Sequence, residues 1–460
     1  MAHKKDLSLN IPETNKPRIV IIGGGFGGIN FLKKIDVSQF QVVVFDRYNY
    51  HTFQPLLYQV ATAGLEPDSV AGPLRKIINK KRNVYFRMLK VSRIDTEKNQ
   101  VLTDAGHLRY DYAVISTGAK INYFGNNDIA KNAFPLKQIT HSLDLRSHIF
   151  QQFEKMEILT DPRKMDQQLT FVVVGAGPTG VEVCGALAEL RKHALPKDYP
   201  ELEIQNMKIY LVEGLDRVLP SMSHKTSLKA YKYLKQLGVE IILECMTKSY
   251  DGTTVELSNE HKIKAGTLIW AAGVKGNLIE GFNEKSIHKG KFHVNRNSQV
   301  YKNPEQKTIY ENIFAIGDVA YMEHENYPKG LPGLAQVAIQ QGKHLAQNLS
   351  KIAKKKELQR FTYKNKGVLA TIGRNKAVAD FPGNIKLAGF FGWIIWMIIH
   401  ILFLVGFRNK IVVFTNWLWN YFTYDRGIRL ILRPSPKKDD KMSREMKIEM
   451  NEAETNKPKK

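Results

Sequence analysis

The sequence predicts an α/β protein with two Rossmann-like dinucleotide-binding domains and a C-terminal membrane-associated helical region. Two glycine motifs carry the first part of this prediction, because each lies between a strand-like apolar run and a helical pattern. The segment 387–406, "LAGFFGWIIWMIIHILFLVG", carries the second part, since it holds no Lys, Arg, Asp or Glu. A chain of 460 residues is long enough for two or three such domains.

The first glycine motif lies in residues 18–35, "RIVIIGGGFGGINFLKKI". The apolar run 19–22 is typical of a strand, and it leads into a glycine turn and then a helical pattern. The next strand, "QVVVFD", ends on an aspartate, where a carboxylate can accept hydrogen bonds from ribose hydroxyls. The residues expected to bind the first dinucleotide are Gly23, Gly25, Gly28 and Asp46.

The second glycine motif lies in residues 169–190, "LTFVVVGAGPTGVEVCGALAEL". It repeats the strand, turn and helix, and the following strand, "KIYLVEG", places a glutamate at its end. No arginine follows this glutamate directly, and a 2′-phosphate would meet its negative charge, so NADH should be preferred over NADPH. The residues expected to bind the second dinucleotide are Gly175, Gly177, Gly180 and Glu213.

The glycines of each motif have separate tasks. One allows the tight turn, one lets the backbone approach the pyrophosphate, and one packs the helix against the strand. The pyrophosphate then lies at the helix N-terminus, where free N–H groups and the helix dipole favour an anion. A single motif of this kind is weak evidence, but two motifs in full strand–turn–helix context indicate two nucleotide sites.

Three further segments run from a strand into a small-residue turn: "YDYAVISTGAK" (110–120), "AGTLIWAAGVKGN" (265–277) and "NIFAIGDVA" (312–320). The first two are expected at crossovers between the nucleotide domains, with Gly118 and Gly273 in their turns. In the third segment a strand ends at Gly317, and we expect Asp318 to reach a second part of an extended flavin dinucleotide.

The formal net charge of +24 favours an anionic partner, either acidic lipid head groups or nucleic acid. Part of the excess lies in residues 69–94, which carry eight Lys or Arg and no acid; a solvated basic face is the simplest interpretation. Nucleic acid is not expected as a partner, because the sequence has no recognisable nucleic-acid-binding motif and no basic stripe interleaved with aromatic residues.

The two cysteines, Cys184 and Cys245, are far apart in the sequence. This disfavours a disulfide framework, a zinc site and a thiol redox pair, so no metal site is expected. The N-terminal stretch before the first strand has no apolar signal-peptide core, and the catalytic body is therefore expected in the cytoplasm.

The sequence resembles the two-dinucleotide-binding-domain flavoproteins, and more closely the type II, non-proton-pumping NADH:quinone oxidoreductases, over roughly residues 17–433. The shared motifs include "FDRYNYHTFQPLLYQVATAGLEP", "GAGPTGVE", "WAAGVKGN" and "FAIGDVA". The most specific ones are "GLAQVAIQQG" (333–342), "KGVLATIGRNKAV" (366–378) and "FLVGFRNKIVVFTNWLWNYFTYDRGIRLI" (403–431).

The resemblance implies FAD in a split first domain, an inserted NADH domain, and respiratory hydride transfer from NADH to FAD and then of two electrons to a membrane quinone. It assigns Gly118, Gly317 and Asp318 to FAD and Gly273 to NADH. The expected parts are an N-terminal extension (1–16), FAD-binding regions (17–125 and 281–386), a connector (126–164), an NADH-binding domain (165–280), a membrane-anchoring region (387–433) and a charged disordered tail (434–460).

Four residues are expected to carry catalysis. Gln336 and Gln340 are one helical turn apart, and two amides on a small-residue face can bind a quinone or the flavin edge. From spacing alone a helix with two exposed amides is the alternative; the resemblance favours the quinone site. Glu182, near the start of a helix, is either a favourable charge in the first turn or, by the resemblance, a group for proton delivery or substrate positioning. Lys366 is its expected electrostatic partner.

The apolar segment 387–406 is interpreted as a monotopic anchor on the cytoplasmic face of the cell membrane. Basic residues follow it, and the nucleotide domains must also meet cytoplasmic NADH, so an even number of crossings is required. The second apolar run, 411–422, is too short to span a bilayer. A single transmembrane helix at 387–406 and a buried soluble helix remain alternatives.

Two other functions stay open. One is an NADH-binding flavoprotein reductase of another acceptor, and the other is a membrane-tethered redox sensor. The motif "AQVAIQ" together with the apolar C-terminal region favours the enzyme, because a sensor needs neither. The lipid bilayer surface is an expected partner, and a homodimer is a further expectation that the sequence does not test.

Overall fold

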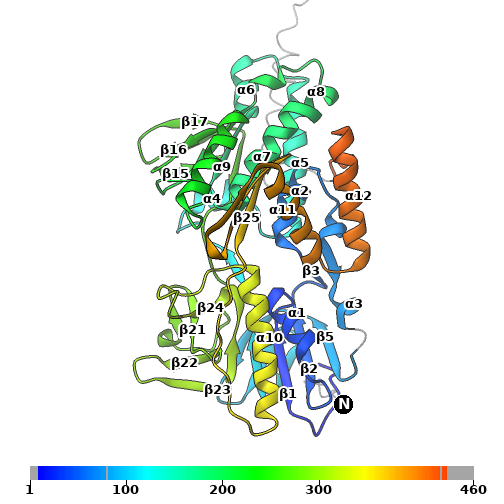
Figure 1. Ribbon diagram of the computed structural model, residues 1–460, viewed down its shortest axis with the longest axis vertical. Coiled ribbons are helices and arrows are strands. Elements are labelled where there is room, and N and C mark those ends of the chain that lie inside the picture. Colours follow the sequence, from blue (N-terminus) through cyan, green and yellow to red (C-terminus); the bar gives the residue numbers. More distant parts are fainter. Residues whose placement is uncertain (1–8, 79–80, 425–426, 433–460) are drawn as a thin grey trace, which may run out of the picture. The chain divides into compact units, whose positions relative to one another are not determined.

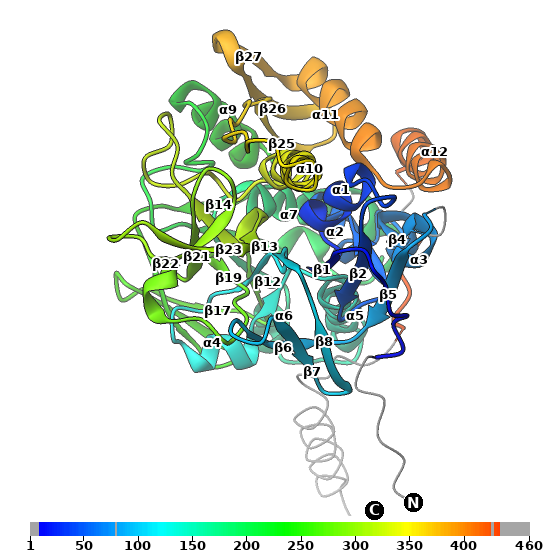
Figure 2. The same cartoon turned by 90° about the horizontal axis from the view of Figure 1, so that it is seen from below.

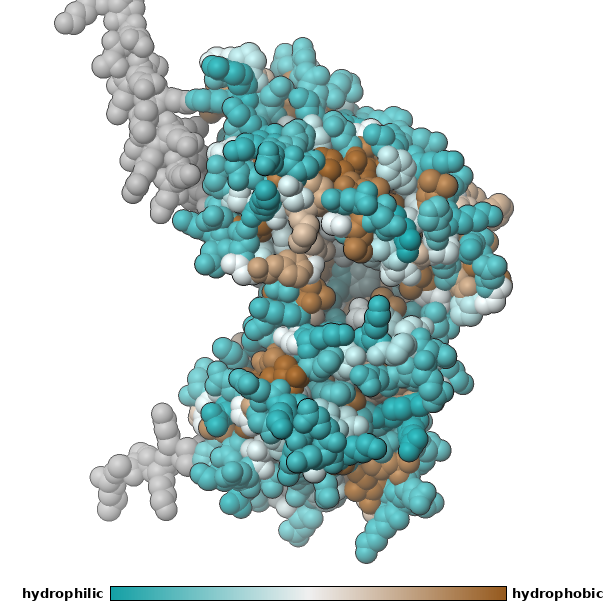
Figure 3. All heavy atoms as spheres, turned by 90° about the vertical axis from the view of Figure 1, so that its left-hand side faces the viewer, coloured by the Kyte–Doolittle hydropathy of each residue, from teal (hydrophilic) through white to brown (hydrophobic). Residues whose placement is uncertain are grey.

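The computed structural model describes residues 9–78, 81–424 and 427–432. The described residues form two compact units. Figure 3 shows a face on which hydrophilic side chains predominate and hydrophobic ones gather in small patches, as a chain with 24% charged residues would produce. Unit 1 comprises Met1–Thr52, Ala71–Asn122 and Val274–Lys366, and unit 2 comprises Phe53–Val70, Tyr123–Gly273 and Gly367–Lys460, each within the described residues.

Unit 1 is built on a sheet with the strand order β20-β21-β22-β23-β9-β1-β2-β5, in which β24 pairs with β21. The strands from β23 to β5 are parallel, so their carboxyl ends meet at one edge. The strands are β1 Arg18–Ile22, β2 Gln41–Asp46, β5 Val84–Met88, β9 Tyr112–Ile115, β20 Ile287–His288, β21 Lys291–Val294, β22 Gln299–Asn303, β23 Thr308–Ala315 and β24 Ala320–Met322.

Smaller elements complete unit 1. β3 (Tyr50–Thr52) pairs with β4 (Ala71–Pro73), and β10 (Ala119–Ile121) pairs with β19 (Val274–Gly276). A separate antiparallel sheet contains β6 Val91–Asp95, β7 Gln100–Thr103 and β8 Gly106–Arg109. The helices are α1 Phe26–Lys34, α3 Leu74–Ile78, α10 Ala335–Ile352 and the 3₁₀ turns η5 Glu284–Ser286 and η6 Gly317–Val319.

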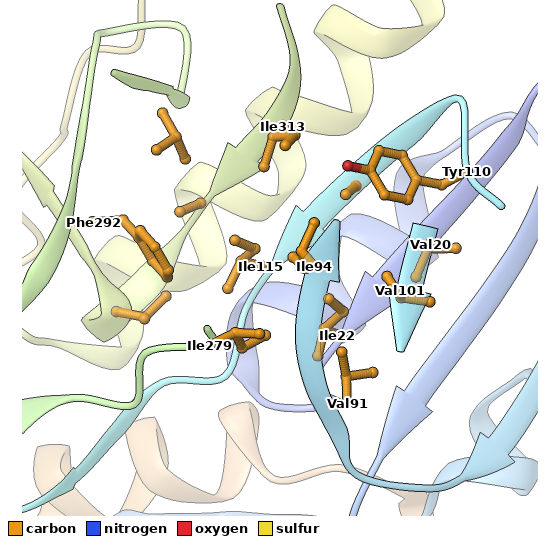
Figure 4. Packing of buried hydrophobic residues seen from close by; sticks show 14 of the residues in the cluster. Val20, Ile22, Val91, Ile94, Val101, Tyr110, Ile115, Ile279, Phe292 and Ile313 are labelled. Atoms are coloured by element: carbon orange, nitrogen blue, oxygen red, sulfur yellow. The ribbon is translucent and has the colours of Figure 1, made fainter. Parts of the chain in front are cut away.

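Helix α10 lies beside α1 in both views of the ribbon (Figures 1 and 2). A Cβ atom on Gly342 would collide with the backbone carbonyl oxygen of Gly27, so the absence of a side chain lets the two helices approach closely. The apolar cluster drawn in Figure 4 joins β1, β9 and β23 with the β6–β8 sheet, and it includes Ile22, Ile94 and Phe292. This packing fixes the sheet edge that carries the first glycine motif.

Unit 2 contains a parallel sheet in the order β11-β18-β12-β13-β14. Its strands are β11 Phe134–Pro135, β12 Thr170–Val174, β13 Lys208–Val212, β14 Glu240–Ile242 and β18 Thr267–Trp270. An antiparallel sheet adds β15 Thr247–Tyr250, β16 Thr254–Leu257 and β17 Lys262–Lys264. The helices of this part are α4 Asn127–Asn132, α5 Ile139–Met156, α6 Pro162–Gln168, α7 Pro178–Glu189, η3 Leu190–Ala194 (a π-helix), α8 Leu195–Asp198, η4 Ile204–Asn206 and α9 His224–Gln236.

Two segments distant in sequence also belong to unit 2. One contains η1 Gln54–Leu56, α2 Leu57–Ala61 and η2 Pro67–Val70. The other contains the antiparallel sheet β25 Val368–Gly373, β26 Lys376–Phe381 and β27 Ile385–Ala388, with η7 Pro382–Asn384, and the helices α11 Gly389–Phe403 and α12 Phe407–Thr423. A Cβ atom on Gly185 of α7 would collide with the carbonyl oxygen of Ile372, so α7 packs closely on β25.

The apolar segment 387–406 is not one continuous helix. Its first two residues belong to β27, α11 ends at Phe403, and Gly406 has φ +93° before α12 begins. Among the residues that the structure describes, no helix combines the length and the apolar character that crossing a membrane would require. The second apolar run, 411–422, lies within α12.

The two units group the chain differently from the expected domain ranges. Residues 53–70, 123–125 and 367–386 belong to unit 2 rather than to the unit that contains the first glycine motif, and residues 274–280 belong to unit 1 rather than to the unit that contains the second. The proposed domain boundaries stay a prediction. The charged tail, 434–460, lies outside the described residues.

Candidate functional site

The first glycine turn joins β1 to α1 at the carboxyl edge of the unit 1 sheet. Gly23 has φ +110°, a conformation that L side chains rarely adopt, and its carbonyl oxygen accepts a 2.8 Å hydrogen bond from Ser116 Oγ. A Cβ atom on Gly28 would collide with the Gly23 carbonyl oxygen. At Gly25 a Cβ atom would meet only Ser116 O, at 4.0 Å, among the described residues. The turn therefore has no room for a side chain at Gly28 but leaves space beside Gly25. This arrangement fits a pyrophosphate at the N-terminus of α1.

Asp46 ends β2 beside this turn. Its carboxylate accepts hydrogen bonds from the backbone N–H groups of Gly24, at 2.6 Å, and Tyr48, at 2.8 Å. Burial raises the pKa of Asp46, and these hydrogen bonds oppose the rise. His51 completes the arrangement, because its Nδ1 lies 3.0 Å from the Gly24 carbonyl oxygen and must donate to it. The backbone N–H and the carbonyl oxygen of Gly24 are thus both held by side chains.

The third part of this edge is the turn after β23. Gly317 has φ +75°, and its N–H donates a 2.7 Å hydrogen bond to Gln341 Oε1. Asp318 follows in η6. Gly118, after β9, has φ +69°, and a Cβ atom there would meet no described atom within 4 Å. The expected flavin residues therefore share one edge, and the space beside Gly25 and Gly118 would let a dinucleotide approach the backbone.

The second glycine turn, between β12 and α7, repeats this geometry in unit 2. Gly175 has φ +99°, and a Cβ atom on Gly180 would collide with its carbonyl oxygen. Glu213, just after β13, accepts hydrogen bonds from the N–H groups of Ala176, at 2.6 Å, and Leu215, at 3.0 Å. A Cβ atom on Gly177 would meet nothing described within 4 Å, so this turn also leaves space there.

Gly273 has φ +66° in the turn after β18, the strand next to β12. It therefore lies at the carboxyl end of the same parallel sheet as the second glycine turn. The residues of each expected dinucleotide site are thus brought together, those of the first site in unit 1 and those of the second site in unit 2.

Gln336 and Gln340 lie on one face of α10, as expected, but their oxygen atoms bind backbone. Gln336 Oε1 accepts from the N–H of Lys366 at 3.0 Å, and Gln340 Oε1 accepts from the N–H of Lys364 at 3.1 Å. Gln340 Nε2 also donates to the Lys364 carbonyl oxygen at 2.9 Å. The two amides therefore hold the segment 364–366 against α10.

Glu182 lies deep in unit 2, on the face of α7 that packs against β25, and is only 6% exposed. Burial raises the pKa of its carboxyl group to about 8, while a hydrogen bond from the backbone of Thr371 opposes the rise and the nearby indole of Trp396 opposes it less. The expected partner Lys366 belongs to the other unit, and that pairing stays a prediction.

A pocket in unit 2 opens onto Glu182 and encloses about 870 Å³ including its mouth. Helices α2, α7, α11 and α12 and strand β25 contribute its walls. Its lining combines ionisable and polar side chains with aromatic ones. The ionisable and polar residues are Gln59, Thr62, Glu182, Glu189, His193, Thr371, Arg374 and Asn420, and the aromatic residues are Tyr58, Trp393, Trp396, Trp417, Tyr421 and Tyr424.

Helix α12 is attached to the segment 57–70 by polar contacts. Trp417 Nε1 donates to Gln59 Oε1 at 2.7 Å, and Asn416 Nδ2 donates to Glu66 Oε2 at 2.7 Å. The opposite face carries exposed apolar side chains at helical spacing. These are Phe407, Ile411, Phe414, Leu418 and Phe422, and their exposed fractions range from 48% to 79%.

Comparisons with known proteins agree with this geometry. The family model of the pyridine nucleotide-disulphide oxidoreductases matches residues 17–342, and that of the NDH2 C-terminal domain matches residues 365–424. Among solved structures, NDH2 of Plasmodium falciparum in complex with NADH is similar, with a TM-score of 0.81 and 23% identity, covering 91% of this chain and 100% of that one. A sulfide:quinone oxidoreductase of Aquifex aeolicus gives a TM-score of 0.65 at 20% identity, covering 88% of this chain and 95% of that one. These structures support the fold.

The paired glycine turns and the matched family model define a pyridine nucleotide-disulphide oxidoreductase. The type II NADH:quinone oxidoreductases Ndh and NdhA of Mycobacterium tuberculosis are 35% and 34% identical to this chain, with 89% of the chain covered in both cases and 89% and 88% of the relatives. The chain belongs to the type II NADH:quinone oxidoreductase family. The predictions of family, fold class, FAD and NADH are thereby confirmed.

The sequence did not reveal two groups that build these sites. Ser116 and Gln341 each fix a backbone group at the edge that carries the first glycine turn. Gln341 follows directly after the expected Gln340, and an internal hydrogen-bonding role for it could only be recognised once α10 was placed against η6.

Proposed function

We propose that this protein oxidises NADH and reduces a membrane quinone in the respiratory chain, without pumping protons. Family membership supports FAD as the cofactor and NADH as the substrate. FAD, when bound, accepts a hydride and passes two electrons on. The observation that carries the proposal is the presence of two open glycine turns, each at the carboxyl edge of its own parallel sheet, in a chain of this family.

The residues of unit 1 would bind the flavin. Gly23, Gly25 and Gly28 shape the turn that receives the pyrophosphate, and Asp46 would bind the adenosine ribose while its carboxylate stays anchored to the Gly24 N–H. Gly118 would leave room for the cofactor. Gly317 and Asp318 would bind the remaining part of FAD, and Gln341 holds the backbone N–H of Gly317 in position.

The residues of unit 2 would bind NADH. Gly175, Gly177 and Gly180 repeat the turn, and Gly273 would contribute the neighbouring turn. Glu213 would accept hydrogen bonds from the ribose hydroxyls, and its charge would repel a 2′-phosphate. This arrangement supports the preference for NADH over NADPH.

We propose the pocket beside Glu182 as the quinone site. Its aromatic lining residues suit a flat apolar ring, and Glu182 supplies a protonated carboxyl group near neutral pH because burial raises its pKa to about 8. We also propose a quinone-site role for Gln336 and Gln340, as the resemblance implies, and Lys366 as the electrostatic partner of Glu182; the two amides order the segment that ends at Lys366.

The surface of α11 and α12 supports association with the cytoplasmic face of the membrane. Their exposed side chains include Phe391, Leu402, Phe407 and Phe422, each at least 65% exposed, and a lipid surface would cover this apolar area. The quinone could then reach the pocket from the bilayer. A second proposal is a homodimer, in which another copy of the chain covers part of this apolar surface.

The proposal is tested with the purified full-length protein. We expect a visible flavin spectrum, bleaching of that spectrum by NADH, and oxidation of NADH that depends on a short-chain quinone. Protein without flavin absorbance, or flavin that NADH reduces but no quinone reoxidises, would contradict it. Flotation with anionic vesicles, compared with neutral ones, tests the membrane surface separately.

A further inference from the structure

One face of α7 and of the following π-helix η3 carries a regular series of residues. Glu182, Ala186, Glu189 and His193 follow one another at intervals of four, three and four residues, and all of them line the pocket. Residues at these intervals share a helix face. Two carboxyl groups and an imidazole therefore share one helix face that lines the pocket.

The burial of this series changes along the helix. Glu182 is 6% exposed, whereas Glu189 and His193 are half-buried. His193 stacks on Tyr424, with ring centroids 4.1 Å apart. The series thus runs from two partly exposed groups to the more buried carboxyl group, that of Glu182.

The reaction needs a path that brings a proton from solvent into the pocket. Written in full, NADH, one proton and quinone give NAD⁺ and quinol, so each turnover takes up one proton from water in addition to the hydride. The proton must reach a site that aromatic residues shield. Resting on the proposed function, we propose that His193 and Glu189 conduct this proton, through water in the pocket, to Glu182, which passes it to the quinone.

The spacing requires water between the groups. Seven residues separate Glu182 from Glu189, which corresponds to about 10 Å along a helix and is too far for direct transfer. Ala186 lies between them, and its small side chain leaves space beside the helix. Carboxylate oxygens and the hydroxyl of Thr371 give water molecules in that space the polar partners that they need.

Arg374 contacts both Glu189 and the aromatic residues beside this series. Glu189 Oε1 accepts a hydrogen bond from the backbone N–H of Arg374, and the Arg374 guanidinium lies 4.0 Å from the ring centroids of both Tyr421 and Tyr424. The other titratable groups that line the pocket are Tyr58 on α2 and these two tyrosines. Glu182 holds its proton near neutral pH, because burial raises its pKa to about 8. Transfer to the quinone leaves a carboxylate that the series can protonate again.

His193 and Glu189 are positioning groups that act through Glu182, so the test separates electron transfer from proton transfer. Ferricyanide takes electrons without protons, whereas a short-chain quinone needs both. We expect His193→Phe, which preserves the ring stacking, and Glu189→Gln to lower kcat with quinone about tenfold or more. Ferricyanide reduction should stay within about twofold of wild type. His261→Phe and Glu201→Gln make the same changes at exposed positions outside the pocket and serve as matched controls.

Chemical rescue distinguishes a relay from a structural effect. Imidazole added to His193→Phe, and formate added to Glu189→Gln, should restore quinone reduction without changing ferricyanide reduction. Flavin content and melting temperature identify a variant that fails to fold, in which case the other variant decides. Equal losses with both acceptors, unchanged quinone rates or a lack of rescue would overturn the relay. A wild-type protein that cannot reduce quinone would instead overturn the proposed function.

Discussion

The burial of the Glu182 carboxyl group leads to a prediction about the free energy of unfolding that does not depend on catalysis. Its pKa is about 8 in the folded protein, compared with 4.5 for an ordinary glutamate. The folded state therefore keeps a proton that the unfolded state loses, and the free energy of unfolding falls as the pH rises from about 4.5 to about 8. Above this range the contribution of Glu182 is constant.

The size of this change in the free energy of unfolding follows from the pKa shift of Glu182. Each pH unit in this range corresponds to about 1.4 kcal/mol, so the whole shift corresponds to as much as about 5 kcal/mol. Glu182→Gln keeps the size and the neutral form of the side chain but cannot ionise. The variant should resemble wild type near pH 5 and become progressively more stable than wild type towards pH 8.

The assay compares denaturant unfolding of the two proteins at pH 5.5, 6.5 and 7.5. Glu201→Gln, which removes the same charge from an exposed position, is the matched control and should follow wild type at every pH. Parallel curves for Glu182→Gln and wild type would refute the reasoning, because they would mean that Glu182 is ionised in the folded protein throughout. The same variant should also slow quinone reduction, and an unchanged pH–rate profile would count against proton delivery.

Three other substitutions test the remaining sites. Gln336→Leu removes the acceptor of the Lys366 N–H and should slow quinone reduction while NADH still reduces the flavin at its normal rate in stopped-flow measurements; the reverse pattern would contradict the assignment. Gly28→Ala places a methyl group against the Gly23 carbonyl oxygen and should give protein with little bound flavin, measured from the visible spectrum. Glu213→Gln should raise kcat/KM for NADPH relative to NADH by about tenfold, and an unchanged ratio would show that another group sets the preference.

Local patterns made the nucleotide sites predictable. In each glycine motif the turn, the helix start and the acid after the next strand lie close in sequence, and the structure brings Gly23 to Asp46 and Gly175 to Glu213 as that spacing requires. The hydrogen bond itself joins equivalent groups in both, from the N–H after the first glycine to the acid. Short-range chemistry therefore determines these sites.

The pocket beside Glu182 was less predictable, because distant segments form it. Gln59 and Trp417 meet across more than three hundred residues of chain, and no local pattern couples them. The sequence also could not show that Gln336 and Gln340 bind backbone, since an amide oxygen on a helix surface can bind either backbone or a ligand. This contact became visible only when the segment 364–366 was placed against α10.

The attachment of α12 has a practical consequence for handling the protein. A helix of a water-soluble enzyme usually turns its apolar side inward, whereas here Asn416 and Trp417 face the protein and Phe414 and Phe422 face outward. In plain buffer such molecules should adhere to one another through this side as their concentration rises. A mild detergent should separate them by covering the exposed phenylalanines. The hydrogen bonds of Asn416 and Trp417 should meanwhile keep α12, and the part of the pocket that it lines, in place.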